Sequence, residues 1–365
     1  MNNFNARWPR FKGLLRTQLR DLTAIQPGNR RWQMPFAAAL ASGLPLLVGA
    51  YFDRMDYGLI SSIGGLVFLY LPATPLSHRM LWLMSCGFGM AACYALGLMS
   101  HFVPLLMVGV LSFIAILVTM VCRVYRLGPP GSLFFIMAAA IGAYSPVEVI
   151  DVPLKVGLIT MGALLACLIA FFYSIFILRL VAPEPVPALP EPSFDFVVFD
   201  SIVIGSFVGL ALVLAQLLQL DRPYWVPVSC LAVIQGASLR AVWNRQLHRV
   251  LGTMVGLLLA WGVLLLPLDQ WSVALVMMLL TFVIETTVVR HYGFAVIFIT
   301  PLTILLAEAA TLGQGRPAAL IEARLIDTVL GSLVGLLGGA CLHSPRFRAV
   351  VGRRIRRLIP SRLLP

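Results

Sequence analysis

Long apolar runs separated by short polar segments are the dominant pattern of this chain. The runs are continuous over roughly 17 to 25 residues, the length that an α-helix needs to cross the hydrocarbon core of a bilayer. They lack the alternating segments of about ten residues that are typical of a transmembrane β-barrel. The predicted spans are 33–52, 57–73, 80–99, 102–122, 131–147, 153–178, 197–219, 224–238, 248–267, 270–287, 292–310 and 322–343.

Composition supports a membrane protein and excludes a soluble one. The 365 residues are 60% hydrophobic and 12% charged, whereas a soluble domain has about 25% charged residues. A bilayer solvates apolar side chains but forces every backbone amide to pair within a helix or a closed barrel. We therefore expect an all-α, polytopic transmembrane bundle of about 12 helices in contact with lipid.

Basic residues are distributed unevenly between the two predicted sides of the membrane. If the N-terminus lies in the cytoplasm, 22 of the 27 Lys and Arg residues fall on the cytoplasmic side. This asymmetry follows the positive-inside rule and predicts that both termini are cytoplasmic, as a basic segment at 1–32 and a basic tail at 345–365. The net charge of +12 is then explained by topology and by attraction to anionic headgroups, so no nucleic-acid partner is expected.

Segment 181–196 is rich in Pro and Glu and is predicted to be a cytoplasmic linker. It separates a first transmembrane repeat, 33–180, from a second, 197–344. The repeats echo each other at an offset of about 168 residues, pairing Asp53-Arg54 with Asp221-Arg222, Tyr57 with Tyr224, Arg123 with His291, Lys155 with Arg324 and Gly162 with Gly331. Because six spans is an even number, both repeats have the same orientation, and we expect a pathway at the pseudo-twofold axis between them.

The second repeat contains most of the candidate substrate-binding residues. Tyr224 and Trp225 lie between two prolines, as in an aromatic belt at the membrane interface or in an interrupted helix beside a pathway. Arg240, Arg245 and Arg249, with His248, are placed between two spans on the cytoplasmic side. Arg245 and Arg249 share a helix face, and guanidinium groups bind carboxylates in a bidentate manner. This face is either a collecting site for an organic anion or a positive-inside anchor.

Ionisable residues at membrane depth are further candidates, because a charge at the bilayer centre costs at least about 2.5 kcal/mol. Glu285 and Asp327 are candidate proton-coupling residues, with structural roles as the alternative. Arg324 lies one turn from Asp327 and is a candidate substrate ligand or the partner of a local ion pair.

Glycines at a spacing of four residues are candidate helix-packing positions. Gly252 and Gly256 follow the arginines directly, and Gly331 and Gly335 repeat the spacing in the last span. Thr253 is a candidate to bridge neighbouring helices or to face a lumen.

The sequence contains no apparent motif of catalysis or cofactor binding. The sequence has no phosphate-binding loop, nucleophile elbow, zinc motif or haem-type histidine arrangement, and its six cysteines form no C-x-x-C pair. We therefore expect no enzyme activity, no cofactor and no metal.

These features resemble the fusaric acid resistance and aromatic acid exporter family (FUSC family, integral membrane bound transporter domain). The resemblance is clearest over 197–343 and rests on Arg222-Pro-Tyr-Trp225, on Arg245 to Arg249 leading into Gly252-Thr253 and Gly256, and on Arg324 to Thr328 with Gly331. Ser85-Cys86-Gly87-Phe88-Gly89 is a poor version of the Gly-Thr motif in the first repeat. The resemblance implies an exporter of aromatic or other organic carboxylic acids in a bacterial inner membrane, with a periplasmic adaptor as a further partner; assembly as a homo-oligomer is left open.

The favoured hypothesis is a secondary transporter that is driven by a proton gradient, in which the arginines collect the anion. Two alternatives are a passive organic-anion channel and a non-transporting scaffold of an envelope assembly. Flux that depends on a pH gradient distinguishes the first from the other two.

Overall fold

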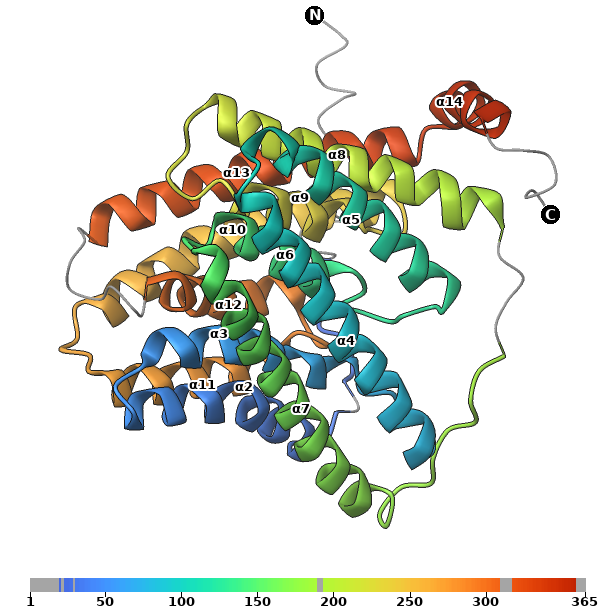
Figure 1. The fold of residues 1–365 in the computed structure, drawn as a ribbon. Helices are drawn as coiled ribbons and strands as arrows, with labels where there is room; N and C mark the ends of the chain where they lie inside the picture. The colour runs from blue at the N-terminus through green and yellow to red at the C-terminus, as the bar shows by residue number, and fades with distance from the viewer. Residues whose placement is uncertain (1–19, 21–22, 29, 189–192, 309–316, 359–365) are drawn as a thin grey trace, which may run out of the picture.

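The computed structural model describes residues 20, 23–28, 30–188, 193–308 and 317–358, and within these ranges it is helical without any strand. Eight of its helices are long and apolar enough to cross a membrane (Figure 1). They are α2 (Gln33–Tyr51), α4 (Leu76–His101), α5 (Pro104–Val124), α7 (Val152–Ile177), α8 (Asp200–Leu217), α10 (Leu239–Leu264), α11 (Gln270–Thr287) and α13 (Pro317–Leu342). A protein with several membrane spans is thereby confirmed.

Four further apolar helices are shorter. They are α3 (Met55–Gly65), which continues into a 3₁₀ segment at Leu66–Tyr70, α6 (Leu133–Tyr144), α9 (Trp225–Ile234) and α12 (Tyr292–Glu308). The ten residues of α9 rise only about 15 Å, half of the hydrocarbon core of a bilayer. Each of the twelve predicted spans overlaps one of these long or short helices, but length supports a crossing for eight, so twelve crossings stay a prediction.

Long and short helices occur in the same order before and after residue 181: long, short, long, long, short, long. The same neighbours also recur. The second helix of each half packs on the sixth, as α3 on α7 and α9 on α13, and the third packs on the fifth, as α4 on α6 and α10 on α12. Between the halves, α5 packs on α8 and α11 packs on α2.

Local sequence explains where several helices begin and how closely they pack. Ser238 accepts a hydrogen bond from the Ala241 amide and starts α10. Asp269 and Ser272 form a capping box at the start of α11, and these hydrogen bonds lower the pKa of the Asp269 carboxyl. Gly331 lets α13 approach α9 so closely that a Cβ atom there would lie 2.3 Å from the Val226 carbonyl oxygen.

The outer surface of the bundle carries large apolar side chains, among them Phe113, Met161 and Leu258. The interior contains the short helices, since nine of the ten residues of α9 are buried. This arrangement is that of a membrane bundle, in which lipid covers the long helices and the long helices cover the short ones.

One end of the bundle is where α7 ends at Ile177 and α8 begins at Asp200, and it is called the linker end below. There α13 meets a further helix, α14 (Pro345–Leu358). The described part of the basic tail predicted at 345–365 is helical, as α14. A π-helical turn at Asp195–Phe199 precedes α8, so the helical structure begins slightly before the predicted span.

Candidate functional site

Three charged side chains are buried around the short helix α9. Arg249 comes from α10, and Arg324 and Asp327 come from α13; all three are at most 5% exposed. The Arg249 guanidinium donates a hydrogen bond of 3.3 Å to the Ser229 hydroxyl on α9. The Arg324 guanidinium lies 4.1 Å from the centre of the Trp225 ring, also on α9. We call these residues, with Ser229 and Trp225, the α9 cluster.

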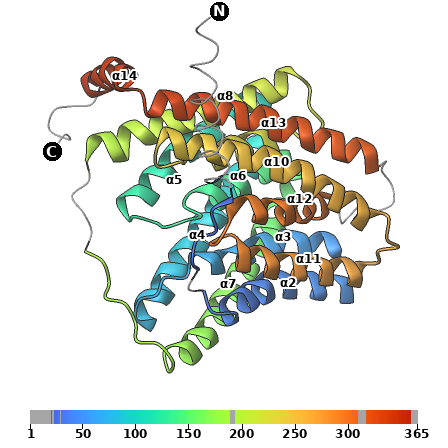
Figure 2. The same ribbon diagram turned by 180° about the vertical axis from the view of Figure 1, so that it is seen from behind.

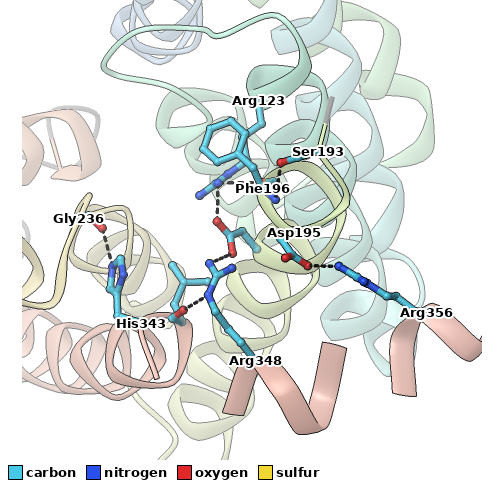
Figure 3. A network of polar contacts seen from close by, with 10 residues as sticks. Arg123, Ser193, Asp195, Phe196, Gly236, His343, Arg348 and Arg356 are labelled. Carbon is cyan, nitrogen blue, oxygen red and sulfur yellow. Dashed lines mark hydrogen bonds and ion pairs between the residues drawn. The ribbon is translucent and has the colours of Figure 1, made fainter. Parts of the chain in front are cut away.

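The α9 cluster lies near mid-depth in the bundle. The end of α9 is at the linker end, because the Gly236 carbonyl oxygen is 3.0 Å from the His343 ring nitrogen beyond the end of α13 (Figure 3). Trp225, at the start of α9, is therefore about 15 Å further in along the helix axis. Arg249 is ten residues into α10, which is again about 15 Å from the linker end.

Several charged atoms of the cluster have no hydrogen-bond partner among the described residues. They are Nε of Arg249, Nε and Nη1 of Arg324 and both carboxylate oxygens of Asp327. The local ion pair suggested by the spacing of Arg324 and Asp327 is therefore not formed. A buried polar group without a partner costs about 1 to 3 kcal/mol, and a charged one costs more. These groups therefore destabilise the fold. Ionisable residues that are costly to bury within a membrane are typical of ligand-binding positions.

Neutral polar side chains surround the charged ones. Gln246 on α10 and Thr328 and Ser332 on α13 are buried, and each has an oxygen without a described hydrogen-bond partner. Thr328 belongs to the Arg324 to Thr328 motif noted in the sequence. A single sequence could not indicate Gln246 or Ser332, because the role of a polar residue in an apolar helix depends on which helix it faces.

A small cavity opens beside Arg324 and Asp327. Its volume is about 20 Å³, and it is lined by Arg222, Trp225, Ile304, Leu320, Ala323, Arg324 and Asp327. The cavity is partly open and reaches both charged side chains.

The two aromatic candidates have different surroundings. Trp225 is 3% exposed and packs in the protein interior under Arg324, so it does not belong to an interfacial belt. Tyr224 is half-buried, and its ring lies 6.0 Å from that of Tyr144 on α6, a helix of the other half. The structure therefore favours the second of the two interpretations, in which a short helix begins inside the bundle at Trp225.

The basic residues before Gly252 lie on a helix, as the shared face expected for Arg245 and Arg249 requires. The helix α10 begins at Leu239, nine residues before the predicted span, and carries Arg240, Arg245, His248 and Arg249 on its first turns. Of these, Arg249 reaches the α9 cluster, whereas Arg240 is exposed and Arg245 is half-buried. The His248 ring instead lies 5.0 Å from the His291 ring at the start of α12.

The packing candidates on α10 face α12 and not α9. A Cβ atom at Gly252 would lie 2.8 Å from the Gly293 carbonyl oxygen, and one at Gly256 would lie 2.6 Å from that of Ile297. On α13, Gly335 lies against the Cys230 carbonyl of α9 as Gly331 does against Val226. Thr253 is buried one turn from Arg249.

Glu285 does not belong to the α9 cluster and has a partner of its own. Its carboxylate accepts a hydrogen bond of 2.6 Å from Arg30, just before α2. A second ion pair of the same kind joins Arg123 on α5 to Asp200 on α8 at 2.7 Å. In each pair one residue belongs to the first half and the other to the second, so both pairs are contacts between the halves.

Comparison with known proteins agrees with these observations. Residues 210–338 match the family model described as fusaric acid resistance protein-like, and this range contains the whole α9 cluster. An uncharacterized membrane protein of Bacillus subtilis (strain 168), YvaC, is 22% identical over 88% of this chain and 74% of its own length. No solved structure matches the chain. The resemblance to the fusaric acid resistance family is thereby confirmed.

Proposed function

We propose that this protein is a transporter of small organic anions and that the α9 cluster is its substrate site. The observation that carries the proposal is the set of unpartnered charged atoms on Arg249, Arg324 and Asp327 at mid-depth. An anion that entered between the helices would supply acceptors for the free guanidinium nitrogens. These new hydrogen bonds would offset the free energy that burying the unpartnered guanidinium nitrogens costs.

The chemistry of the cluster suits a carboxylate attached to an apolar or aromatic body. Two guanidinium groups provide donors for the carboxylate, and Trp225 provides an aromatic surface beside them. The helix dipole of α9 adds partial positive charge, since its N-terminus is at Trp225 within the bundle. Aromatic or other organic carboxylic acids are the substrate class that the family resemblance implies.

Helix order and packing support a transporter built from two six-helix repeats. Short helices hold equivalent places in the two halves, and discontinuous or short helices at mid-depth are typical of transporter binding sites. The small volume of the cavity supports alternating access over an open pore. We place the linker end in the cytoplasm of a bacterium, as the excess of arginine there predicts. Outward transport across the inner membrane is the direction that the family resemblance implies.

Asp327 is the proposed site of proton coupling. Its carboxylate lines the same cavity as Arg324 and has no described hydrogen-bond partner. Protonation of Asp327 would neutralise a negative charge beside Arg324. Proton binding and substrate-anion binding in this cavity would therefore affect each other. Glu285 is less suited to this role, because Arg30 already occupies its carboxylate.

Flux of a labelled aromatic carboxylate into proteoliposomes tests the proposal. Uptake should depend on an imposed pH gradient, and Arg249→Gln should reduce it strongly while the matched control Arg245→Gln, one turn earlier on α10, should not. Equal loss in both variants would show that the cluster is not the site. A large passive conductance would replace the transporter with a channel, and absence of any flux together with a stable protein partner would indicate a scaffold.

A further inference from the structure

The last described helix, α14, has an arginine stripe on the side that points away from the bundle. Arg346, Arg353 and Arg357 are exposed and are spaced seven and four residues apart, so they share one side of the helix. We call these three residues the α14 stripe. Within the described part of the chain, none of them forms an ion pair.

The opposite side of α14 is fixed to the bundle. Its apolar residues Phe347, Val351 and Ile355 pack in a cluster with Phe199 at the start of α8. Arg348 forms an ion pair with Asp200, and Arg356 forms one of 2.9 Å with Asp195 (Figure 3). These contacts orient the helix, and they therefore also orient the α14 stripe.

The position of α14 is that of a helix at the membrane surface. Only two residues separate it from the end of α13 at Leu342, and its partners Asp195 and Asp200 lie at the start of α8. Both are ends of candidate membrane spans. Figures 1 and 2 show α14 at the edge of the bundle, beyond the end of α13.

We propose that the α14 stripe binds the headgroups of anionic phospholipids. Guanidinium groups donate two parallel hydrogen bonds to a phosphate, and three of them here face outward at the depth where headgroups lie. Each basic residue held near an anionic membrane surface strengthens binding about fivefold. The charges of the stripe and of such headgroups are complementary, and the apolar side of the helix is occupied by the bundle.

Hydrogen exchange of the α14 amides in lipid nanodiscs tests this assignment. The full-length protein is compared in phosphatidylcholine alone and in phosphatidylcholine mixed with phosphatidylglycerol. Exchange should slow on the order of tenfold in the mixed discs, and added salt should reverse the slowing, because headgroup contacts at the surface are screened. The triple variant R346Q/R353Q/R357Q should lose the lipid dependence.

A double variant, R126Q/R179Q, is the matched control, since both arginines are exposed near the linker end but lie outside α14. It should keep the lipid dependence. Equal exchange of wild-type α14 in the two lipids would overturn the proposal, and so would equal loss in the control. Protection by an acidic peptide but not by phosphatidylglycerol would assign the stripe to a protein partner instead. The salt series on the wild-type protein tests the proposal even if the triple variant does not fold.

Discussion

The two halves of the protein make the same helix crossing with different side chains. In the first half α7 crosses α3, and a Cβ atom at Gly162 would lie 1.8 Å from the Ser61 carbonyl oxygen. In the second half α13 crosses α9, and a Cβ atom at Gly331 would lie 2.3 Å from the Val226 carbonyl oxygen. Lys155 holds the place in α7 that Arg324 holds in α13. The Lys155 ammonium group donates to the Ser145 hydroxyl at 3.0 Å, whereas two nitrogens of Arg324 lack a described partner.

This difference distinguishes the glycine contacts, which both crossings share, from the buried charges, which occur at the second crossing. Both crossings need the glycine, so the close approach is a property of the architecture. The unpartnered charges occur at the second crossing, while hydrophobic Leu158 and Ile159 hold the place of Asp327 in the first. The match to the family model also covers the second crossing and not the first. The charges of the α9 cluster are thus best explained by binding, since the equivalent crossing is made without them.

The largest effect is expected from filling the glycine contacts. Gly331→Leu and Gly162→Leu both place a side chain where a carbonyl oxygen already lies, and overpacking of this severity costs about 3 kcal/mol or more. Both variants should lose most of the folded, monodisperse yield in size-exclusion chromatography. Gly109→Leu is the control, because a Cβ atom there meets nothing within 4 Å. A normal yield for either crossing variant would contradict the equivalence of the two crossings.

Removing the two equivalent cations should have opposite effects on stability. Arg324→Gln removes a buried charge, two of whose nitrogens lack a described hydrogen-bond partner. The melting temperature in detergent should therefore stay the same or rise, while substrate binding weakens about tenfold to a hundredfold. Lys155→Gln removes hydrogen bonds to Ser145 and Pro146, so it should lower the unfolding free energy by about 1 kcal/mol and leave binding unchanged. A fall in stability for Arg324→Gln would show that its role is structural.

The two acidic residues should also differ when their charge is removed. Asp327→Asn should abolish the dependence of flux on a pH gradient and leave substrate binding measurable. Glu285→Gln breaks the ion pair with Arg30 and should lower stability by about 1 kcal/mol without changing the pH dependence. Flux in proteoliposomes at several imposed pH gradients measures the effect of Asp327→Asn, and thermal unfolding measures the loss of stability in Glu285→Gln. Loss of pH dependence in the Glu285 variant alone would move the coupling site to the contact between the halves.

The smallest effect is expected from the hydroxyl that holds Arg249. Ser229→Ala removes a hydrogen bond of 3.3 Å, and a bond of this kind contributes about 1 kcal/mol. Substrate affinity should therefore fall about fivefold. Ser61→Ala, at the corresponding place in α3, should leave affinity unchanged. An equal effect of both substitutions would argue against a site confined to the second half.

The sequence predicted the helices well because hydropathy reports burial in lipid directly. Every predicted span overlaps a helix, and the apolar runs of the long helices were sufficient to find them. The length of α9 was harder to predict. The predicted span at 224–238 includes Gln235 to Ser238, but these residues form the turn between α9 and α10. The helix α10 begins nine residues before the predicted span, because its first turns carry arginines that hydropathy does not count as part of an apolar run.

The candidate site was predicted in part. Trp225, Arg249, Arg324 and Asp327 were identified from residue type, and the structure brings them together around α9. The contacts of Glu285 with Arg30 and of His248 with His291 could not be foreseen, because they join residues that are far apart in sequence. Spacing along one helix also suggested an Arg324 to Asp327 pair, which the side-chain directions do not form.

The shortness of α9 has a consequence for how voltage acts on the protein. Because α9 starts at mid-depth, the non-helical residues 218–224 pass through the half of the bundle opposite the linker end, and they include the exposed carboxylate of Asp221. Irregular backbone at such depth is tolerated where protein buries it or water surrounds it, and the exposed Asp221 carboxylate favours water. Water in that half would carry little of the electrical potential. In the proposed transport of an anion, most of the voltage would then act between the linker end and Trp225.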